Sequence, residues 1–392
     1  MLALPTVFTG PLGSVLMRCA SLRRLALRLV LLLPLGAGAE DDSSPLPAFT
    51  LPPGFTLEVV SDDLPNARQL ALGPEGTLFA GTRRDGRVWA LKDGVRYTLA
   101  EGLNLPSGVA VHNGDLYVAA VSHLYRLPNI EKQLETPPAL EVITDALPTD
   151  KHHGWKHIEF SAAGDLFIPV GAPCNICDPE PPYASLLRMD PRTGAFEIYA
   201  RGIRNTVGFD FEPGTGALWF SDNGRDMLGD EIPPEELNRI TAPGAHFGYP
   251  YVHGGVLLDP EFGDGHRLDA YEAPAFRLPA HSAPLGLAFY TGSAFPERYQ
   301  GALFLAEHGS WNRSSKIGYQ VSVAFLEDGR ITRLEPFLTG FLRGEETLGR
   351  PVDVLVEPEG TLLVSDDHRG AVYRIRYTGP QGATPTLARS TP

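Results

Sequence analysis

The chain of 392 residues carries 33 Lys and Arg against 47 Asp and Glu, and this net charge of −14 argues against a nucleic-acid partner, which would need a basic surface. A hydrophobic share of 43% is enough for a buried core and excludes disorder of the whole chain. With 42 Gly and 36 Pro, the composition favours many short elements joined by turns over long helices.

Residues 1–39 are predicted to be a cleaved signal peptide. Residues 18–28 form a basic stretch, 29–35 an apolar stretch, and 37–39 a small-residue cleavage site. The alternative is a membrane anchor, but the apolar run is far shorter than the roughly 20 residues that span a bilayer. We therefore expect an exported protein, periplasmic or extracellular, with no membrane span in its mature form and with residues 40–50 as a linker.

A repeated strand pattern runs through the rest of the chain. Each copy has an alternating apolar strand, a turn, a Gly-x-Leu step into a second strand, and a further alternating strand. Successive copies begin roughly 40 to 85 residues apart, a range that fits propeller blades of four short strands with insertions. The six copies open at residues 70–79, 109–117, 158–167, 209–219, 287–304 and 354–363.

The fold class predicted from this pattern is all-β, a single six-bladed β-propeller over residues 51–378. An extra strand at residues 55–63 precedes the first blade and is expected to complete the last one, which would close the ring. The alternatives are a β-sandwich or two smaller β domains. Residues 379–392 are expected to be a disordered C-terminal tail.

Cys174 and Cys177 are the two cysteines outside the predicted signal peptide, which contains Cys19. In an oxidising compartment, such a pair is expected to form a disulfide that closes a tight loop. A redox-active dithiol is the alternative. The flanking Pro173 and Pro179 indicate a loop and favour a structural disulfide.

A histidine-rich segment, residues 152–157, directly precedes the first strand of blade three. Histidine titrates near neutrality and can take a proton from an alcohol, so His153 or His152 is a candidate general base. The plain alternative is a solvated polar loop. Arg204 and Asn205 occupy the same relative position before blade four, where an arginine could bind a carboxylate or phosphate.

Further polar residues follow the second strands of blades four and five. Residues 221–231 combine glycines with oxygen donors, which suits Ca²⁺ but also a metal-free acidic turn. Near Trp311, Arg313 and Lys316 could hold a planar anion by charge and stacking. Arg350 adds a cation before blade six, and such a concentration of cations in an acidic chain indicates an anionic ligand.

Taken together, several of these segments resemble the soluble pyrroloquinoline quinone (PQQ)-dependent sugar dehydrogenases, in their glucose/sorbosone dehydrogenase branch. The resemblance implies a six-bladed propeller that binds PQQ and Ca²⁺, oxidises an aldose or related sugar, and passes electrons to an external acceptor, a cytochrome or a quinone. The segments are Leu51-Pro-Pro-Gly-Phe55, His153-Gly-Trp-Lys156, Val170-Gly-Ala-Pro-Cys-Asn-Ile-Cys177, Arg204-Asn205, His308-Gly-Ser-Trp-Asn-Arg313 and Arg350-Pro-Val-Asp353.

The resemblance also implies roles for the residues that match the family's motifs. His153 matches the general base, with His152 in place of the acidic residue that often precedes it. Arg204 and Asn205 match the pair over cofactor and substrate. Catalysis would then consist of proton removal by the histidine and hydride transfer to the quinone.

For the cofactor and its calcium, the matches are spread over several blades. Gly224 and Arg225 match positions whose main-chain carbonyls hold Ca²⁺, which would act as a Lewis acid. Arg350 matches an arginine that binds cofactor carboxylates, while Val352 stands where the family has a second arginine. The remaining expected cofactor contacts are Lys316, Arg313 and Asn104.

Two other functions fit a six-bladed propeller. A calcium-dependent lactonase or esterase would hold Ca²⁺ on side-chain carboxylates in the channel and would not need the cations. A non-enzymatic binding module of the NHL type would need no base. A nicotinamide cofactor is disfavoured because no Rossmann glycine fingerprint opens a helix in the sequence.

Overall fold

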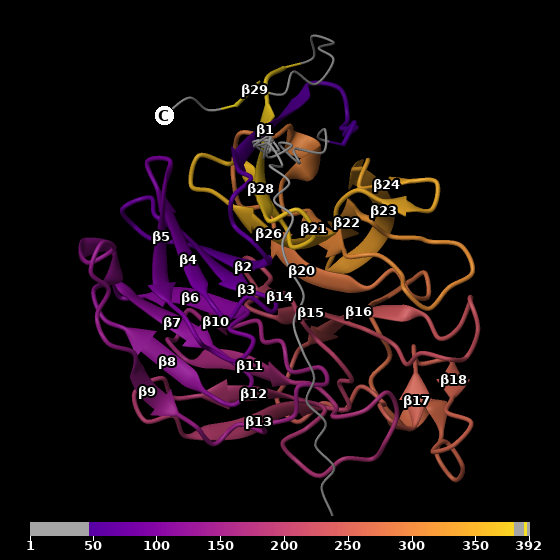
Figure 1. Cartoon of the computed structure of the whole chain (residues 1–392). Helices are drawn as coiled ribbons and strands as arrows, with labels where there is room; N and C mark the ends of the chain where they lie inside the picture. The colour runs from indigo at the N-terminus through magenta and orange to yellow at the C-terminus, as the bar shows by residue number, and fades with distance from the viewer. Residues whose placement is uncertain (1–46, 380–387, 390–392) are drawn as a thin grey trace, which may run out of the picture. The chain divides into compact units, whose positions relative to one another are not determined.

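The computed structural model describes residues 47–379 and 388–389, in which strands form six blades arranged as a β-propeller (Figure 1). This confirms the predicted fold class. The predicted signal peptide and residues 40–46 lie outside the described residues. The described end of the predicted linker packs on the propeller, where Phe49 contacts the rings of Phe341 and Tyr373 and Thr50 pairs with Thr339.

Blades one to three follow one another along the chain, each as an antiparallel sheet of four strands. Blade one is β2 (Ala67–Leu72), β3 (Leu78–Thr82), β4 (Val88–Lys92) and β5 (Val95–Ala100). Blade two is β6 (Gly108–His112), β7 (Asp115–Ala119), β8 (Leu124–Leu127) and β9 (Glu141–Thr144). Blade three is β10 (Glu159–Phe160), β11 (Leu166–Val170), β12 (Ser185–Met189) and β13 (Phe196–Arg201).

Blades four to six contain the longer insertions. Blade four is β14 (Phe209–Phe211), β15 (Leu218–Asp222), β16 (Glu235–Ile240) and β19 (Phe276–Leu278), with the hairpin β17 (Val252–His253) and β18 (Leu257–Leu258) inserted. Blade five is β20 (Pro284–Phe289), β21 (Leu303–Glu307), β22 (Gln320–Glu327) and β23 (Arg330–Leu338). Blade six is β26 (Pro351–Val356), β27 (Leu362–Asp366), β28 (Ala371–Tyr377) and β1 (Phe55–Ser61), preceded by the hairpin β24 (Leu342–Arg343) and β25 (Glu346–Thr347).

The ring is closed by β1, as the sequence predicts. This N-terminal strand pairs antiparallel with β28, from Phe55 opposite Tyr377 onward, so the two ends of the propeller meet in one blade (Figure 1). Because neither strand is left as an open edge at this junction, closure protects the ring from pairing with other chains. Within the predicted tail, β29 (Ala388–Arg389) pairs in parallel with β1.

In the Gly-x-Leu step, the glycine and the leucine each have a structural role. Gly76, between β2 and β3, has a φ of 83°, a conformation that a residue with a Cβ adopts at a cost. The leucine two residues later, Leu78, begins the next strand and is buried against the neighbouring blade. Gly114 and Leu116 repeat this arrangement in blade two, where Leu116 is fully buried. The step therefore combines a tight turn with an inter-blade contact.

Between residues 47 and 379, helical structure is limited to three short 3₁₀ turns, at Ile130–Lys132, Leu268–Ala270 and Glu297–Tyr299. Within the part of the chain that the structure describes, no helix is long and apolar enough to cross a membrane. At one end of the ring, the loops that lead into each first strand meet the loops that leave each second strand, because the two strands run antiparallel. The candidate site lies among these loops.

Candidate functional site

A cavity of about 560 Å³ lies at this end of the propeller and is lined by residues from several blades. Its size falls within the range of sites that hold small molecules and cofactors. Of the predicted site residues, His153, Arg204, Asn205, Gly224 and Arg350 line this cavity, together with His152. The structure thus brings together residues that are far apart in the sequence.

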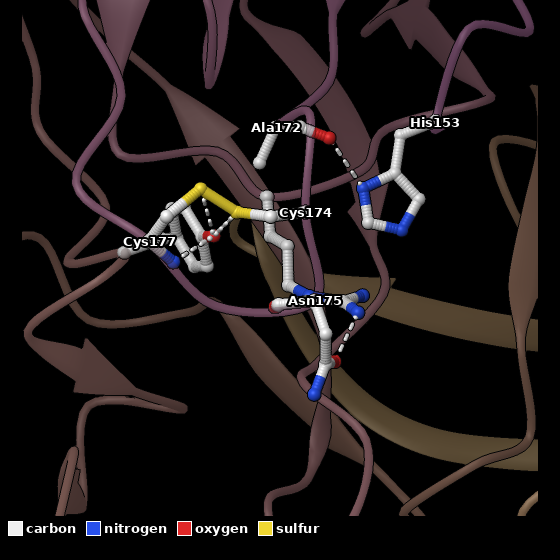
Figure 2. Close-up of a disulfide and its surroundings, with 7 residues drawn as sticks. His153, Ala172, Cys174, Asn175 and Cys177 are labelled. Carbon is white, nitrogen blue, oxygen red and sulfur yellow. Dashed lines mark hydrogen bonds between the residues drawn. A yellow bond between two sulfur atoms is a disulfide. The ribbon is translucent and has the colours of Figure 1, made fainter. Parts of the chain in front are cut away.

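His153 lies in the loop between β9 and β10, and its ring is oriented by the backbone of another loop. Its Nδ1 lies 2.8 Å from the carbonyl oxygen of Ala172, so Nδ1 carries the hydrogen and Nε2 is left as the unprotonated nitrogen (Figure 2). Burial lowers the pKa of His153 well below its usual value, and the charge of Arg204 lowers it further. The imidazole is therefore neutral near pH 7 and can accept a proton.

The neighbouring His152 is exposed, whereas His153 is half-buried. His153 also has a φ of 49°, an uncommon conformation for a residue with a side chain, and such outliers cluster at functional sites. Directly behind it, a Cβ on Gly171 would lie 2.6 Å from the Cβ of His153. A glycine at position 171 therefore leaves the space that the histidine occupies.

Arg204 is buried, with 3% of its surface exposed. Its guanidinium donates to the main-chain oxygen of Asn175 through Nε and to the side-chain oxygen of Asn175 through Nη2, both at 2.8 Å. Nη1 donates to the carbonyl of Asn223 at 3.0 Å, and Nη2 lies 3.3 Å from Asp226. A buried arginine held this closely presents one defined orientation to a ligand.

Asn205 is the next residue and is held through its main chain. Its N–H donates to Asp222, and its carbonyl oxygen accepts from the side chain of Asn223. The side-chain oxygen of Asn205 is buried and has no hydrogen-bond partner within residues 47–379. A buried acceptor without a partner is costly, so this oxygen is a candidate contact for a hydroxyl group of a ligand.

Blades one and six supply a group of cations. Arg68, from β2, and Arg83, directly after β3, share the carboxylate of Asp367 at 3.0 and 3.5 Å. The guanidinium of Arg350 donates to the main-chain oxygens of His308 and Gly309 instead. Two arginines thus share one carboxylate, and a third, Arg350, lines the same cavity with main-chain partners.

This cationic side of the cavity has a net positive charge that an anionic ligand would balance. Burial lowers the pKa of Arg68 to about 10, which leaves it charged at neutral pH. The His308 ring donates through Nε2 to the carboxylate of Asp367 at 2.9 Å, and burial lowers the pKa of His308 to about 4. His308 is therefore neutral near pH 7, and the positive charge comes from the arginines.

The floor of the cavity is apolar. Val207 and Leu285 line it, and they pack with Val352 and with the ring of Trp155. The three aliphatic residues occupy equivalent positions at the entrances of the first strands of blades four, five and six. In blade one, the equivalent position holds Arg68. Apolar side chains beside several cations suit a ligand that combines an apolar ring system with carboxylates.

Blade four provides the acidic side of the cavity. Gly224, Asp226 and Glu235 line it, and the Gly224 N–H donates to Glu235. The side chain of Arg225 points to Asp259 and Glu261, so only its main chain could serve the predicted role. Across the described residues, no group of three His, Cys, Asp or Glu side chains is arranged to hold a metal ion.

Three of the predicted cofactor contacts are not among the residues that line the cavity. Arg313 donates to Asp230 and pairs with Glu231, and Lys316 donates to the Glu345 carbonyl at 2.8 Å. Asn104 is exposed, and its main-chain oxygen accepts from Val121. Their predicted roles stay predictions.

Arg68 and Arg83 are the functional candidates that the sequence did not single out. A signal for Arg83 exists in the repeat: it follows the second strand of blade one, as Asn223 follows that of blade four and His308 that of blade five. All three line the cavity. Alignment of these positions across blades would have identified Arg83, whereas Arg68 lies within a strand whose apolar pattern conceals it.

The predicted pairing of the cysteines is present in the structure. Cys174 and Cys177 form a disulfide in the loop between β11 and β12 (Figure 2). The loop lies next to Tyr249, whose hydroxyl accepts a hydrogen bond from the Cys177 N–H at 3.1 Å. Ala172 and Tyr249 form a small apolar cluster with Cys174 and Ile176, which anchors the loop to blade four.

Comparison with known proteins agrees with this architecture. Residues 124–374 match the family model described as Glucose / Sorbosone dehydrogenase. An uncharacterized protein of Borreliella burgdorferi is 34% identical over 354 residues, covering 86% of this chain and 93% of its own. The aldose sugar dehydrogenase YliI of Escherichia coli is 31% identical over 185 residues, covering 46% of this chain and 43% of its own.

Among solved structures, the holo form of the pyranose dehydrogenase PQQ domain from Coprinopsis cinerea has a TM-score of 0.72 and 19% sequence identity. The match covers 85% of this chain and 98% of that one, so the two share a fold. The match to the family model runs from the third strand of blade two into blade six and includes His153, Arg204 and Arg350. The chain belongs to the glucose/sorbosone dehydrogenase family.

Proposed function

We propose that the protein oxidises an aldose or related sugar with PQQ as its cofactor. The observation that carries this proposal is the composition of one cavity: Arg68, Arg83 and Arg350 lie on blades one and six, and His153, with an unprotonated Nε2, lies on blade three. In a ring of six blades, blade three is opposite blade six. Family membership and the PQQ-containing structural relative support the same function.

The residues present fit PQQ by charge and by polarity. PQQ is a planar ring system with three carboxylates and an ortho-quinone, so it needs several cations beside a flat apolar surface. Arg68, Arg83 and Arg350 provide the cations, and Val207 and Leu285 provide part of the apolar floor. Arginine forks bind carboxylates bidentately, which makes these side chains suitable partners.

We include Ca²⁺ in the proposal, held by the main-chain carbonyls of Gly224 and Arg225. The support is the chemistry of this side of the cavity, where Asp226 and Glu235 add carboxylate oxygens beside Gly224. Calcium prefers oxygen donors and accepts carbonyls as readily as carboxylates. A divalent cation here would lie on blade four, opposite Arg68 and Arg83 on blade one.

In the reaction, His153 would take the proton of the sugar hydroxyl on the carbon that is oxidised, because its Nε2 is an unprotonated nitrogen on a buried, oriented ring. When bound, PQQ supplies a quinone that takes up the hydride of that carbon. Arg204 would direct its remaining N–H toward negative charge that develops in the cavity. Asn205 would accept a hydrogen bond from a sugar hydroxyl.

The test is an assay of dye reduction by the purified protein reconstituted with PQQ and Ca²⁺. We expect an artificial electron acceptor to be reduced when a panel of aldoses is added, only in the presence of PQQ, and less after chelation of calcium. Dye reduction that does not depend on PQQ would overturn the proposal, as would the absence of turnover when PQQ is bound. A cytochrome or a quinone is the expected natural acceptor, and export to the periplasm or beyond remains a prediction.

A further inference from the structure

One short loop contacts both residues to which the proposed function assigns chemistry. The main-chain oxygen of Ala172 lies 2.8 Å from Nδ1 of His153, and the N–H of Ala172 donates to the main-chain oxygen of Arg204, also at 2.8 Å. Three residues further, Asn175 accepts two hydrogen bonds from the Arg204 guanidinium. The same loop therefore orients the imidazole of His153 and the guanidinium of Arg204.

Asn175 uses its main-chain oxygen and both polar atoms of its side chain in this arrangement. Its side-chain oxygen accepts from Nη2 of Arg204 and from the N–H of Asp226, both at 2.8 Å, and its side-chain nitrogen donates to the Asp226 carbonyl at 3.1 Å. The side-chain amide of Asn175 thus connects the guanidinium of Arg204 to the main chain of Asp226. Asn175 does not line the cavity, so it acts on the site from behind.

Arginine has five N–H groups. In the described residues, Nε, one N–H of Nη1 and both of Nη2 have protein acceptors, on Asn175, Asn223 and Asp226. One N–H, on Nη1, is left for a ligand. Loss of the Asn175 contacts would free two more N–H donors of Arg204 and allow its side chain to rotate. The guanidinium would then no longer have one fixed orientation toward a ligand.

The position of Asn175 is itself held by the disulfide. Cys174 and Cys177 flank it, and their bond closes a loop that contains only Asn175 and Ile176 (Figure 2). The Cys177 N–H donates to the Tyr249 hydroxyl, which anchors the far end of the loop. With the bond intact, the backbone at Asn175 has little freedom.

We propose that Asn175 is the positioning residue for Arg204, and that the Cys174–Cys177 disulfide keeps it in place, so that reduction of this disulfide disables the site without unfolding the propeller. This inference rests on the proposed function for its effect on turnover. It adds that the dehydrogenase is active in its oxidised, disulfide-bonded form and loses activity reversibly under reducing conditions.

The first experiment compares Asn175→Ala with Asn175→Asp in the protein loaded with PQQ and Ca²⁺. Asn175→Ala removes the acceptor for Nη2, and we expect kcat to fall about tenfold to a hundredfold, the usual effect of removing a supporting contact. Asn175→Asp keeps an acceptor for Arg204 and for the Asp226 N–H but loses the donor to the Asp226 carbonyl, so it should retain clearly more of the wild-type kcat than Asn175→Ala. Equal loss in both variants, or loss in neither, would overturn the positioning role.

The second experiment reduces the disulfide. Dithiothreitol supplies two electrons and two protons, which convert the cystine to two thiols while the reagent is oxidised to its cyclic disulfide. The unloaded protein is reduced, freed of reagent, and then loaded with PQQ and Ca²⁺. We expect kcat to fall about tenfold to a hundredfold and to recover on reoxidation, with an unchanged melting transition. Unchanged kcat after both thiols have been titrated would contradict the proposal.

The double variant Cys174→Ser/Cys177→Ser is the matched control for the reagent. It should show the low kcat of the reduced wild type, and dithiothreitol should lower its kcat no further. A further loss in this variant would show that the reagent acts elsewhere and would overturn the assignment to the disulfide.

A readout on the unloaded protein separates this inference from the proposed function. The Arg204 Nε–H, which donates to Asn175, should give a protected signal in ¹H–¹⁵N spectra of oxidised wild type, identified by its absence in Arg204→Lys. The signal should be lost in Cys174→Ser/Cys177→Ser. If it persists there, the positioning inference fails; if it behaves as expected but no sugar is oxidised by the wild type, the proposed function fails instead.

Discussion

The imidazole of His153 and the carbonyl of Ala172 are joined by a hydrogen bond of 2.8 Å, which determines the tautomer of the ring. With Nδ1 as the donor, Nε2 carries the lone pair. Burial and the nearby Arg204 lower the pKa of His153, so the ring is neutral near pH 7 and can accept a proton. This relationship distinguishes His153 from the exposed His152.

Substitution of His153 by Gln is expected to lower kcat by about two to four orders of magnitude, the usual contribution of a general base. The affinity for PQQ should be nearly unchanged, because the cations that would bind the cofactor lie on other blades. His152→Gln is the control and should have a much smaller effect. Near-normal turnover in His153→Gln would contradict its role as the base.

The pH dependence of turnover should reflect the low pKa of His153. A base must be deprotonated, so activity is lost as the pH falls through its pKa. Because burial and Arg204 lower this pKa, the acidic limb of kcat/KM should lie below the ordinary histidine value of about 6.5. A rate profile between pH 4 and pH 8 measures it. An acidic limb above pH 6.5 would be inconsistent with this environment.

Gly171→Ala should displace His153. A Cβ at this position would lie 2.6 Å from the Cβ of His153 and 2.8 Å from its main-chain oxygen, which forces the loop to move. A displacement of this kind near reacting groups can lower the rate about a hundredfold. We expect a large loss of kcat with a small change in melting temperature, and a crystal structure of the variant would show the moved imidazole. A normal kcat in Gly171→Ala would contradict the prediction that the position of His153 depends on a glycine at position 171.

Arg83→Gln should weaken PQQ binding about tenfold, the effect of losing one charged hydrogen bond. Fluorescence of Trp155 and Trp311, which line the cavity, offers a signal for a PQQ titration of the unloaded protein. The adjacent Arg84 is exposed and outside the cavity, so Arg84→Gln is the matched control. Equal affinities of the two variants would remove Arg83 from the binding site.

Asp353→Asn should raise stability at alkaline pH. Burial, with a smaller contribution from Asp210, raises the pKa of Asp353 to about 7, so the folded protein holds a proton that the unfolded chain releases. This favours the folded state at low pH, and the contribution is lost as the pH rises through 7. The gain in melting temperature of the variant over wild type should be large at pH 8.5 and should vanish near pH 3.5, below the ordinary aspartate pKa. A stabilisation independent of pH would point to another cause.

The fold could be predicted because its signals are local. Each blade repeats an alternating pattern and a glycine turn, as at Gly76 and Gly114, and these depend on neighbours in sequence. Closure by the strand predicted at residues 55–63 could also be inferred, because an unpaired strand needs a partner and the last blade lacks one; the observed strand is Phe55–Ser61. The structure confirms both predictions.

The candidate site could be predicted only in part, because many of its side chains form hydrogen bonds and ion pairs with residues that are distant in sequence. Arg204 and Arg350 line the cavity as expected, whereas Arg313 pairs with Glu231, which lies 82 positions away in sequence. Nor did the sequence indicate that Asn175 would hold Arg204, a contact between two loops. Such choices depend on packing that no local pattern encodes.

The most direct test of the account is a single-turnover experiment. The protein loaded with PQQ and Ca²⁺ is mixed anaerobically with an aldose in a stopped-flow spectrometer, without an electron acceptor, and the absorbance of the cofactor is followed. We expect rapid reduction of one cofactor per cavity in the wild type, and reduction slowed by orders of magnitude in His153→Gln. A cofactor that binds in the cavity but stays oxidised with every aldose would contradict the central claim.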